Sequence, residues 1–414
     1  MSVPGETPRT PSRRLRIAIA HDWLCGFRGG EAVLDRIVQI VASDHECAGL
    51  WTMFDDGRGL SASIDSLAKT TSFLNRIPGG PGALRRWLLP LYPTAVGEIS
   101  RSIAREHARQ PIDLLISTSS VAVKGIHVPR SVKHLCYCHA PARYVWSLGE
   151  EYDVGGGLKD RLRSAGLSAV SPWFKRWDRR TAANVDVFLA NSTHTANEIQ
   201  RCFGRDSTVV FPPTRTDFYS LDDSVKRENF WLAAGALEPY KRMDLAIDAA
   251  NEAKHELVVV GGGSAADALR RIAGDTVKFA GRVSDEELRR LYRTASVLLF
   301  PQVEDFGIVA AEAQACGLVV AARAGGGALD TVIPGKTGAL FGEATKQGVI
   351  EAVKNLPMHG ERDCRENAIR FSVQEFDRRM REQIARAAGA VELVGSATRS
   401  TNPTARPGDR AADR

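Results

Sequence analysis

The sequence predicts an α/β protein with two doubly wound, Rossmann-like domains, and three observations support this fold class. Short apolar runs that are typical of buried parallel strands alternate with segments of helical periodicity along most of the chain. The chain has 414 residues, more than a single hydrophobic core normally serves. Glycine-rich turns follow several of the apolar runs, as they do where a strand leads into a helix whose N-terminus receives a phosphate.

The predicted strands form two series. In the first half of the chain they lie at 15–20, 112–118, 132–137 and 185–191, with a helix from about Gly30 and a further strand that ends in the proline pair of 209–213. In the second half they lie near 230–234, 257–260, 277–279, 297–300 and 319–322. We therefore expect an N-terminal domain at 15–212 and a C-terminal domain at 213–370. Ligands should bind at the carboxyl ends of the strands, between the domains.

The two ends of the chain differ in composition from the rest. Residues 371–392 have the pattern of a final helix, whereas 1–14 and 395–414 are polar and rich in Arg and Pro, so we expect disordered tails. The start of the chain has no apolar h-region, and no apolar run approaches the ~18 residues of a membrane span. Seven cysteines without framework spacing indicate free thiols in a reducing compartment. The sequence therefore predicts a cytoplasmic protein.

The chain is basic, with a net charge of +6 and an isoelectric point near 9.0. Such a balance suits a nucleic acid, an anionic membrane surface or a phosphorylated substrate. We find no basic and aromatic module, zinc-finger spacing or recognition helix, so nucleic acid is not an expected partner. A phosphorylated substrate, handled at an anionic membrane surface, would account for the charge.

The stretch from Glu304 to Glu312 carries the sharpest functional signal. The apolar run 296–300 ends at a proline and helical periodicity begins at Ile308, so 304–307 is a strand-to-helix loop whose free N–H groups attract an anion. Glu304 lies on this loop, and Glu312 lies about one turn into the helix. A phosphate on the N–H groups and hydroxyls on the two carboxylates would describe a nucleotide-sugar. The alternative is a solvated helix start, where acids are favoured.

Together with four further motifs, this pattern resembles the signature of retaining GT-B glycosyltransferases of the group 1 type (family 4). The further motifs are His21-Asp-Trp-Leu with Arg28-Gly-Gly-Glu31, Cys136-Tyr-Cys-His-Ala-Pro141, Gly235-Ala-Leu-Glu-Pro-Tyr-Lys-Arg242 and Gly325-Gly-Gly-Ala-Leu-Asp330. The resemblance implies a GT-B architecture, in which two Rossmann-like domains face a central cleft. It also makes 371–392 the helix that crosses back to the N-terminal domain.

The resemblance implies roles for particular residues. His139 and Glu304 become the expected catalytic residues, because they contact the transferred sugar. Lys241 and the helix N-terminus near Gly307 would hold the diphosphate, and Glu312 would hold the ribose. The full set of expected donor contacts is Gly29, Gly30, Lys241, Arg242, Gly262, Arg282, Val283, Phe306, Gly307, Ile308 and Glu312, with the groups around Arg282 and Val283 reading the nucleobase.

One position departs from the family pattern. Ala236 stands where the family usually has an arginine that shares the diphosphate with Lys241. Arg242, or a donor from the other domain, could take the place of that arginine. A solvated Lys-Arg pair that opens a helix is the alternative interpretation of Lys241 and Arg242.

Other interpretations of these motifs compete. His139 could be a structural histidine, and the run Cys136-Tyr-Cys-His139 could bind zinc, although no second ligand pair follows at suitable spacing. Gly29-Gly30 could form a plain tight turn. The run 261–266 matches G-x-G-x-x-A after a strand and so allows a dinucleotide-dependent oxidoreductase, but the acid expected about 20 residues later is supplied only loosely, by Asp285.

Within the family, these motifs look most like those of mannosyltransferases of surface-polysaccharide assembly. The resemblance thus predicts a retaining hexosyltransferase that uses GDP-mannose and acts on a saccharide or a lipid-linked saccharide in polysaccharide or glycolipid biosynthesis. The chain lacks Asp-x-Asp, so we expect no metal and no other cofactor. No carboxylate nucleophile stands out, which favours front-face attack. The alternatives are a transferase of the same family that uses UDP-glucose or UDP-galactose, and a catalytically silent GT-B scaffold, which Ala236 favours.

The segment Leu84–Tyr92 suggests where the acceptor enters. It places Arg85 and Arg86 beside Trp87 and several leucines, with Arg76 nearby. One interpretation is a core helix that ends at Pro90. The other is a surface element that inserts Trp87 into the membrane interface while the arginines meet lipid phosphates. This element would hold the protein at the inner face of the membrane, where a polyprenyl-diphosphate-linked acceptor resides.

Overall fold

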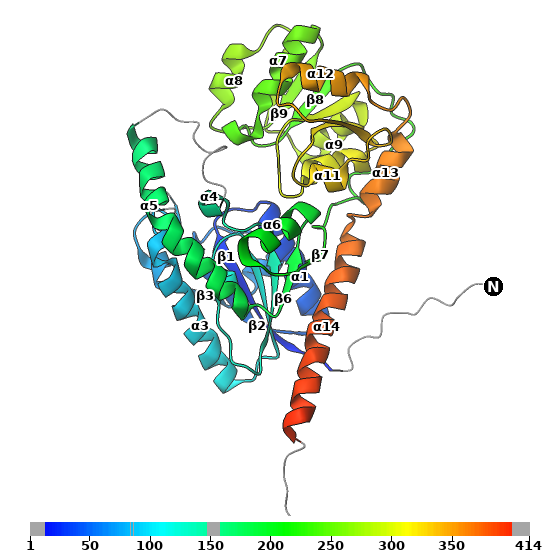
Figure 1. Ribbon diagram of the computed structural model, residues 1–414. Coiled ribbons are helices and arrows are strands. Elements are labelled where there is room, and N and C mark those ends of the chain that lie inside the picture. The colour runs from blue at the N-terminus through cyan, green and yellow to red at the C-terminus, as the bar shows by residue number, and fades with distance from the viewer. Residues whose placement is uncertain (1–12, 83, 86, 147–157, 400–414) are drawn as a thin grey trace, which may run out of the picture.

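The computed structural model describes residues 13–82, 84–85, 87–146 and 158–399. It contains two α/β domains, drawn one above the other in Figure 1, and each is built on a parallel sheet. The N-terminal sheet has the strand order β3-β2-β1-β4-β5-β6-β7, and the C-terminal sheet has the order β10-β9-β8-β11-β12-β13. The expected fold class is confirmed, because both domains are Rossmann-like and doubly wound.

The N-terminal strands are β1 (Arg16–Leu24), β2 (Glu46–Asp55), β3 (Lys69–Thr71), β4 (Leu114–Ser119), β5 (Lys133–Cys138), β6 (Val187–Ala190) and β7 (Thr208–Val209). The C-terminal strands are β8 (Trp231–Ala234), β9 (Leu257–Val260), β10 (Val277–Gly281), β11 (Val297–Phe300), β12 (Val320–Arg323) and β13 (Gly338–Phe341). The N-terminal helices are α1 (Gly29–Asp44), α2 (Ala62–Asp65), α3 (Tyr92–Arg109), α4 (Arg143–Trp146), α5 (Leu158–Thr181) and α6 (Thr193–Phe203). The later helices are α7 (Met243–Ala253), α8 (Ala266–Ile272), α9 (Asp285–Thr294), α10 (Ile308–Ala315), α11 (Ala328–Thr331), α12 (Lys346–Lys354), α13 (Glu361–Ile369) and α14 (Val373–Arg399).

Each strand predicted from the sequence lies within a few residues of an observed strand, whereas β2, β3 and β13 were not predicted. The first half of β2 gives little signal because it reads Glu46-Cys-Ala-Gly49 and contains a glycine at φ +138°. β3 has only three residues and β13 only four, which is too short to show a period. The expected domain boundaries remain predictions.

The final helix is longer than predicted, since α14 continues to Arg399. Most of the two expected tails falls outside the described residues. The interpretation of the segment Leu84–Tyr92 as a core helix is wrong, because the described residues at 84, 85, 87 and 88 form turns, and the short 3₁₀ helix Leu89–Leu91 then leads directly into α3. Arg86 lies outside the described residues, and Leu84, Trp87 and Leu91 are exposed.

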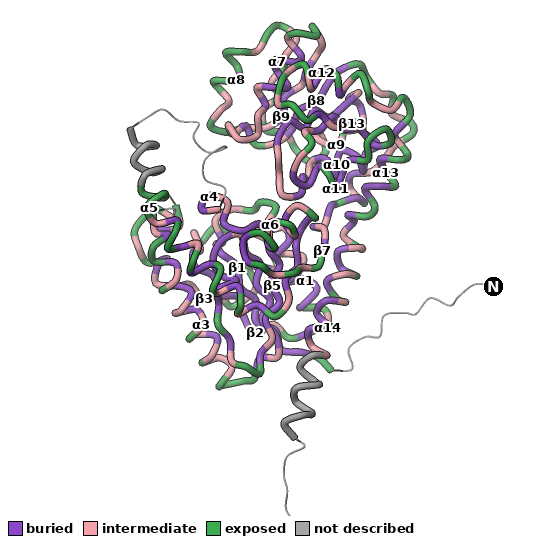
Figure 2. Tube along the Cα trace, in the orientation of Figure 1, coloured by how far each residue is buried: buried purple, intermediate pink, exposed green. Residues whose placement is uncertain are grey.

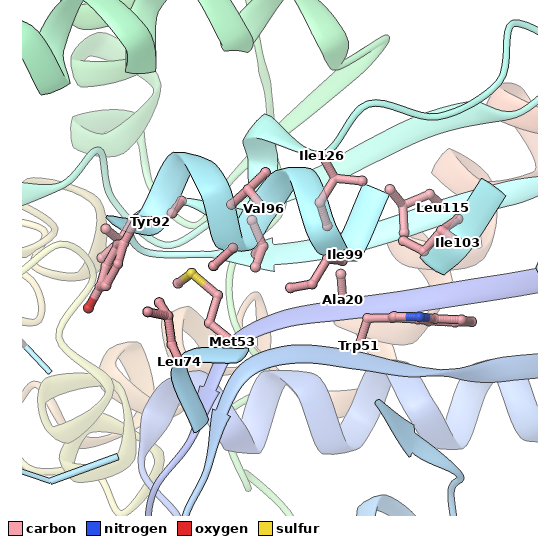
Figure 3. Close-up of a cluster of buried hydrophobic side chains, with 14 of the residues drawn as sticks. Ala20, Trp51, Met53, Leu74, Tyr92, Val96, Ile99, Ile103, Leu115 and Ile126 are labelled. Carbon is pink, nitrogen blue, oxygen red and sulfur yellow. The ribbon is translucent and has the colours of Figure 1, made fainter. Parts of the chain in front are cut away.

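Apolar residues cover both faces of each sheet, as the buried strands of Figure 2 show. In β1 the side chains alternate between two clusters: Ala18 and Ala20 belong to one, and Ile17 and Ile19 to the other. This alternation follows from the two-residue period of a strand. Figure 3 shows the first cluster, in which α3 packs over β1 and β2 through side chains such as Ile99. The C-terminal sheet is likewise covered on both faces by separate clusters.

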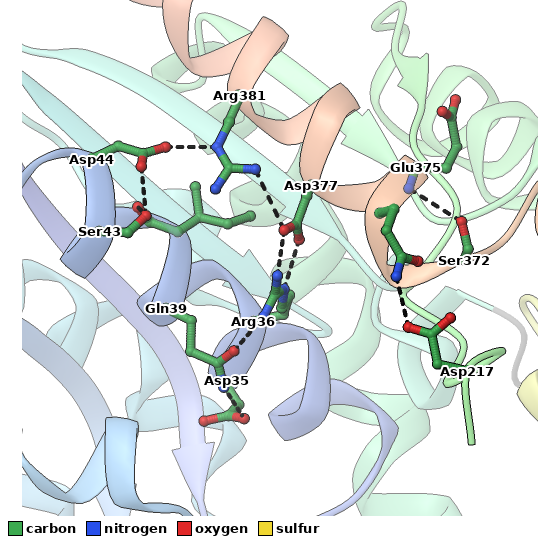
Figure 4. A network of polar contacts seen from close by, with 12 residues as sticks. Asp35, Arg36, Gln39, Ser43, Asp44, Asp217, Ser372, Glu375, Asp377 and Arg381 are labelled. Atoms are coloured by element: carbon green, nitrogen blue, oxygen red, sulfur yellow. Dashed lines mark hydrogen bonds and ion pairs between the residues drawn. The ribbon is translucent and has the colours of Figure 1, made fainter. Parts of the chain in front are cut away.

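Helix α14 joins the domains by returning to the N-terminal one. Phe376, Met380 and Ile384, one turn apart, are buried in the cluster that α1 also covers. Asp377 accepts hydrogen bonds from Arg36 of α1, including one of 2.6 Å to Nε (Figure 4). This arrangement agrees with the crossing helix that the resemblance implies. Among the described residues, no helix combines the length and the apolar character needed to cross a membrane.

A buried carboxylate organises the end of the N-terminal sheet. Asp22 of β1 is 1% exposed, and its two oxygens accept hydrogen bonds from four successive backbone N–H groups. These groups belong to residues 120–123, the loop that follows β4, and their distances to the carboxylate are 2.6 to 2.9 Å. The loop thus receives a fixed backbone conformation from a neighbouring strand.

Replacing Asp22 should therefore destabilise the N-terminal domain. Asp22→Ala leaves several buried N–H groups without an acceptor, and each such group costs about 1–3 kcal/mol. We expect the free energy of unfolding to fall by at least about 3 kcal/mol, measured by urea denaturation. Asp275→Ala, which removes an exposed aspartate, is the control and should change it little. A loss below about 1 kcal/mol for Asp22→Ala would contradict this account.

Candidate active site

The loop between β11 and α10 holds a charged pair. Lys241, which follows β8, forms an ion pair with Glu304, and the two side chains are 13% and 19% exposed. Gln302 donates from Nε2 to Oε1 of Glu304 at 3.2 Å. Its own Oε1 is buried and has no hydrogen-bond partner among the described residues. The structure thus brings together the lysine and the glutamate that the sequence motifs indicate, and it adds Gln302, which no motif indicates.

The glycines that follow β12 fix the backbone of this loop. A Cβ atom on Gly326 would lie 2.1 Å from the carbonyl oxygen of Glu304, and one on Gly327 would lie 2.2 Å from that of Phe306. The N–H of Gly327 donates to the carbonyl of Glu304 at 2.8 Å. Only glycine permits so close an approach. The glycine run therefore fixes the position of the Glu304 backbone.

The next three predicted residues have different environments. The side chain of Phe306 is buried against Phe211 and Phe371, so only its backbone can face a ligand. Gly307 has φ +92° and precedes α10, a conformation that other residues rarely adopt. Ile308 is the first residue of α10, where N–H groups lack partners within the helix. The expectation that these groups bind an anion stays a prediction.

The glycine-rich loop after β9 packs against the loop after β8. A Cβ atom on Gly261 would lie 1.8 Å from the carbonyl oxygen of Gly235, and one on Gly263 would lie 2.4 Å from that of Leu237. A Cβ atom on Gly262 would lie 3.3 Å from Nε of Arg282, so these two predicted residues adjoin. Close packing of two loops explains the glycine run without a bound dinucleotide.

Arg242, which could replace the arginine that is missing at position 236, pairs with a residue of its own segment. Its guanidinium donates to the carboxylate of Asp244 at 3.0 to 3.2 Å, so it is held by its own helix α7. Ala236 itself is exposed. Of the two cations that follow β8, Lys241 is the one directed at the loop of Glu304.

Glu312 lies in α10, where its charge interacts with Arg215 and Tyr292. Burial raises the pKa of its carboxyl to about 8, although the charge of Arg215 opposes the shift. Arg215 is held by Asp285, which accepts at 2.8 Å. The hydroxyl of Tyr292 is buried without a partner among the described residues, and burial followed by the charge of Glu312 raises its pKa. Val283 packs against the same cluster as Tyr292.

His139 follows β5 and is held by its backbone. Its N–H donates to the carbonyl of Ser119 at 2.8 Å, and its carbonyl accepts from Nδ2 of Asn191 at 2.9 Å. Its Nε2 is buried and has no hydrogen-bond partner among the described residues. Burial, with the charge of His21 as a second cause, lowers the pKa of His139 to about 4. The ring is therefore neutral near pH 7 and can accept or donate one hydrogen bond at Nε2.

The N-terminus of α1 packs against this histidine. A Cβ atom on Gly30 would lie 3.7 Å from Nε2 of His139 and 3.9 Å from Cε1 of His21. His21 in turn contacts Thr118 through Nδ1 at 2.5 Å and faces Glu31, whose carboxylate lies 3.9 Å from Nε2. Burial alone would raise the pKa of Glu31, but the contact with His21 and backbone hydrogen bonds outweigh it and lower the pKa. Glu31 therefore stays ionised beneath the glycine turn.

The domains meet at these two helix N-termini. A Cβ atom on Gly29 would lie 3.4 Å from Cδ1 of Ile308, so α1 and α10 approach each other from opposite domains. Arg143 of α4 forms an ion pair with Asp305, and the N–H of Thr193 donates to Asp330 at 2.8 Å. No sequence motif indicates these cross-domain contacts, because the partners lie more than a hundred residues apart.

The predicted residues thus fall into two groups. Across the domains, Gly29 adjoins Ile308, and within the N-terminal domain Gly30 adjoins His139. Within the C-terminal domain, Lys241 pairs with Glu304, Gly262 adjoins Arg282, and Val283 packs against the cluster of Tyr292. Arg242 and the side chain of Phe306 point to other partners. Within the described part of the chain, no group of three His, Cys, Asp or Glu side chains is placed to hold a metal ion.

Two family models match the chain. Residues 222–370 match "Glycosyl transferases group 1", and residues 65–217 match "Glycosyltransferase Family 4". A "GDP-mannose-dependent alpha-(1-6)-phosphatidylinositol monomannoside mannosyltransferase" of Mycolicibacterium smegmatis is 30% identical over 208 residues, which are 43% of this chain and 54% of that protein. The chain thus spans about half the length of the first curated relatives that it matches.

A longer match connects the chain to a "GDP-mannose-dependent monoacylated alpha-(1-6)-phosphatidylinositol monomannoside mannosyltransferase" of Corynebacterium glutamicum. It is 30% identical over 322 residues, 66% of this chain and 84% of that protein. The solved structure of a sucrose-phosphate synthase from Thermosynechococcus elongatus superimposes with a TM-score of 0.69, at 17% identity, and covers 91% of this chain and all of that one. HepE of Anabaena in complex with UDP gives a TM-score of 0.61 at 17% identity over 90% of this chain and 100% of that one. The fold is GT-B, and the chain belongs to the group 1 (family 4) glycosyltransferases.

Proposed function

We propose that the protein transfers a hexose from a nucleoside diphosphate to a hydroxyl group, with retention of configuration at the anomeric carbon. One observation carries the proposal: the N-termini of α1 and α10 meet at Gly29 and Ile308, and the adjacent Gly30 adjoins Nε2 of His139, which has no hydrogen-bond partner among the described residues. Lys241 lies against the loop that leads into α10. Two helix N-termini and a lysine would form an anion-binding site. The diphosphate is the anionic group of a nucleotide-sugar that would bind there.

The proposed chemistry assigns the charges as follows. When the bond between the anomeric carbon and the diphosphate breaks, negative charge grows on the leaving phosphate, where Lys241 and the helix N-termini stabilise it. Without a donor, Glu304 pairs with Lys241. When the diphosphate attracts Lys241, Glu304 would accept hydrogen bonds from hydroxyls of the sugar instead. His139 would hold another sugar hydroxyl through Nε2.

The acceptor oxygen would attack from the face that the diphosphate leaves. The new bond joins this oxygen to the anomeric carbon, and the acceptor proton passes to the departing phosphate oxygen. The protein supplies the positive charge in this scheme, which supports our expectation that no metal is needed. The acceptor would be a saccharide or a lipid-linked saccharide.

We propose GDP-mannose as the donor. Two relatives, each 30% identical, carry names that specify GDP-mannose-dependent mannosyl transfer. The carboxyl of Glu312 interacts with Tyr292, and Val283 packs against the cluster of Tyr292, so we place the ribose and nucleobase near these residues. A UDP-hexose is the alternative donor, and a protein that only binds nucleotide-sugars is the second alternative.

The test compares GDP-mannose with UDP-glucose and UDP-galactose and follows both binding and release of the nucleoside diphosphate. The wild-type protein should bind GDP-mannose most tightly and slowly release GDP in the presence of EDTA. If the protein releases UDP from a UDP-sugar and no GDP from GDP-mannose, the donor is a UDP-hexose. Binding of a nucleotide-sugar without release of its nucleoside diphosphate would indicate a silent scaffold. Turnover that EDTA abolishes would overturn the proposed metal independence.

The two glutamates should affect turnover differently. Glu304→Ala removes the carboxylate that would contact the reacting sugar, so kcat should fall by about 100-fold or more, as the loss of one transition-state hydrogen bond does. Glu312→Ala removes ribose contacts made in both the ground state and the transition state, so it should mainly raise KM for the donor. Steady-state kinetics checks both. Equal and small effects would refute the two assignments.

The raised pKa of Glu312 predicts a pH-dependent stability. An unfolded glutamate loses its proton near pH 4.3, whereas the folded one keeps it until about pH 8. Wild-type protein therefore loses stability as the pH rises between these values, and Glu312→Gln does not. The variant should raise Tm at pH 8 by at least about 3 °C and by much less at pH 5. Glu286→Gln, at an exposed position, is the control. An equal gain at both pH values would contradict the assigned pKa.

We also propose that the segment Leu84–Leu91 docks the protein on an anionic membrane. Leu84 and Trp87 are 42% and 53% exposed, whereas Leu89 is buried and anchors the segment. Trp87 lies beside α5, since a Cβ atom on Gly166 would be 3.9 Å from its ring. The guanidinium of Arg85 lies 4.5 Å from the centre of the Trp23 ring. Exposed apolar side chains and a basic residue on one short segment suit the interface of an anionic bilayer.

Arg85→Glu should weaken this docking. A basic residue near an anionic surface contributes about 1 kcal/mol, or roughly fivefold in binding, and a charge reversal should exceed that. Co-sedimentation with vesicles of phosphatidylcholine and phosphatidylserine measures the change, with circular dichroism to confirm folding. Arg362→Glu makes the same charge change on α13 of the other domain. If both variants sediment alike, the docking segment is wrong.

A further inference from the structure

A second charged contact lies beside the pair of Lys241 and Glu304, and it crosses between the domains. Arg143, the first residue of α4, donates from Nε to Oδ1 of Asp305 at 3.0 Å, and its Nη2 contacts Oδ2. Two parallel contacts between a guanidinium and a carboxylate fix orientation as well as distance. The side chains are 31% and 21% exposed, so the pair is partly shielded from solvent.

Both ends of this pair connect to residues of the proposed reaction. Arg143 follows His139 by four residues, on the connection between β5 and α4. Asp305 directly follows Glu304, whose backbone the glycines after β12 hold at 2.8 Å. The pair therefore joins the segment that carries the histidine to the loop that carries the glutamate. A rotation of one domain relative to the other would separate these two groups and break the pair.

Helix α4 is anchored on the other side by a buried network. The indole N–H of Trp146 donates to Asp178 of α5 at 2.7 Å, and Asp178 pairs with Lys124. The side chains of Lys124 and Asp178 are 2% and 0% exposed. A buried charge requires such a partner, because an unpaired one is strongly destabilising. This network makes α4 a fixed support for Arg143.

We propose that Arg143 is a positioning residue: with Asp305 it forms a cross-domain contact that sets Glu304 against His139 for catalysis. The inference rests on the proposed function. Arg143 acts through Asp305 and does not itself bind the donor diphosphate. The nucleotide contacts assigned above, at Val283 and Glu312, lie in the C-terminal domain and do not depend on the pair.

A double-mutant cycle tests this inference. Arg143→Ala and Asp305→Ala should each lower kcat for GDP-mannose by about tenfold or more, as a displaced catalytic geometry does. The double variant should be no worse than either single variant, because the two residues act as one unit. Arg143→Lys should recover only part of the loss, since a lysine lacks the planar fork. The exchanged pair Arg143→Asp/Asp305→Arg should recover activity relative to the single variants.

Two further measurements distinguish a positioning role from direct binding of the diphosphate. The dissociation constant of GDP, measured by calorimetry, should change less than twofold in Arg143→Ala. The radius of gyration, measured by small-angle X-ray scattering, should increase in both single variants and return toward the wild-type value in the exchanged pair. Arg386→Ala, which removes an exposed ion pair within α14, should alter neither quantity.

The outcomes separate this inference from the proposed function. If GDP binding weakens tenfold in Arg143→Ala and the exchange rescues nothing, Arg143 is a diphosphate ligand and the inference is wrong. Additive losses of kcat, or an unchanged radius of gyration, would also overturn it. If wild-type protein releases no GDP from GDP-mannose while the radius of gyration follows the cycle, the cross-domain contact stands and the proposed function fails.

Discussion

The docking of α14 on the N-terminal domain is the interaction on which the rest of the structure depends. This helix follows the C-terminal domain, yet Phe376, Met380 and Ile384 are buried with the residues of α1 in the first domain. Apolar packing alone does not fix the orientation of the helix. The ion pairs of α14 with Arg36 and Asp44 fix it. Because α1 also carries Gly29 and Gly30 at its other end, the helix that joins the domains packs on the element that supplies half of the proposed anion site.

A chain of aromatic contacts extends from this helix toward the site. The ring of Phe376 lies 6.0 Å from that of Tyr137, and Tyr137 lies 5.3 Å from the ring of His139. Tyr137 also donates its hydroxyl to the carbonyl of Val210 at 2.9 Å, next to the strand that leads out of the domain. Packing against Tyr137 thus fixes the ring of His139, and hydrogen bonds to Ser119 and Asn191 fix its backbone. These contacts fix His139, although its Nε2 has no hydrogen-bond partner among the described residues.

Much of the fold could be predicted from the sequence because buried parallel strands are continuous apolar runs. The strands that were missed are short or, like β2, contain a glycine and polar residues where the run should begin. For the site, the sequence indicated the loops after β5, β8 and β11, since their motifs are local. It could not indicate that Asp244 holds Arg242, nor that Arg143 reaches Asp305, because these contacts depend on side-chain directions and on the packing of two domains.

The arrangement around Asp22 has a consequence for ligand choice. A loop at the end of a parallel strand, with several N–H groups turned inward, is the kind of place that captures phosphate in other α/β proteins. In this protein such a loop follows β4, but the carboxylate of Asp22 already occupies its N–H groups. The chain thus carries its own competing anion at that loop. At the start of α1, by contrast, the carboxylate of Glu31 accepts the N–H of Arg28, the residue that precedes the helix. In our proposal a phosphorylated molecule therefore binds at α1, because Asp22 already occupies the loop after β4.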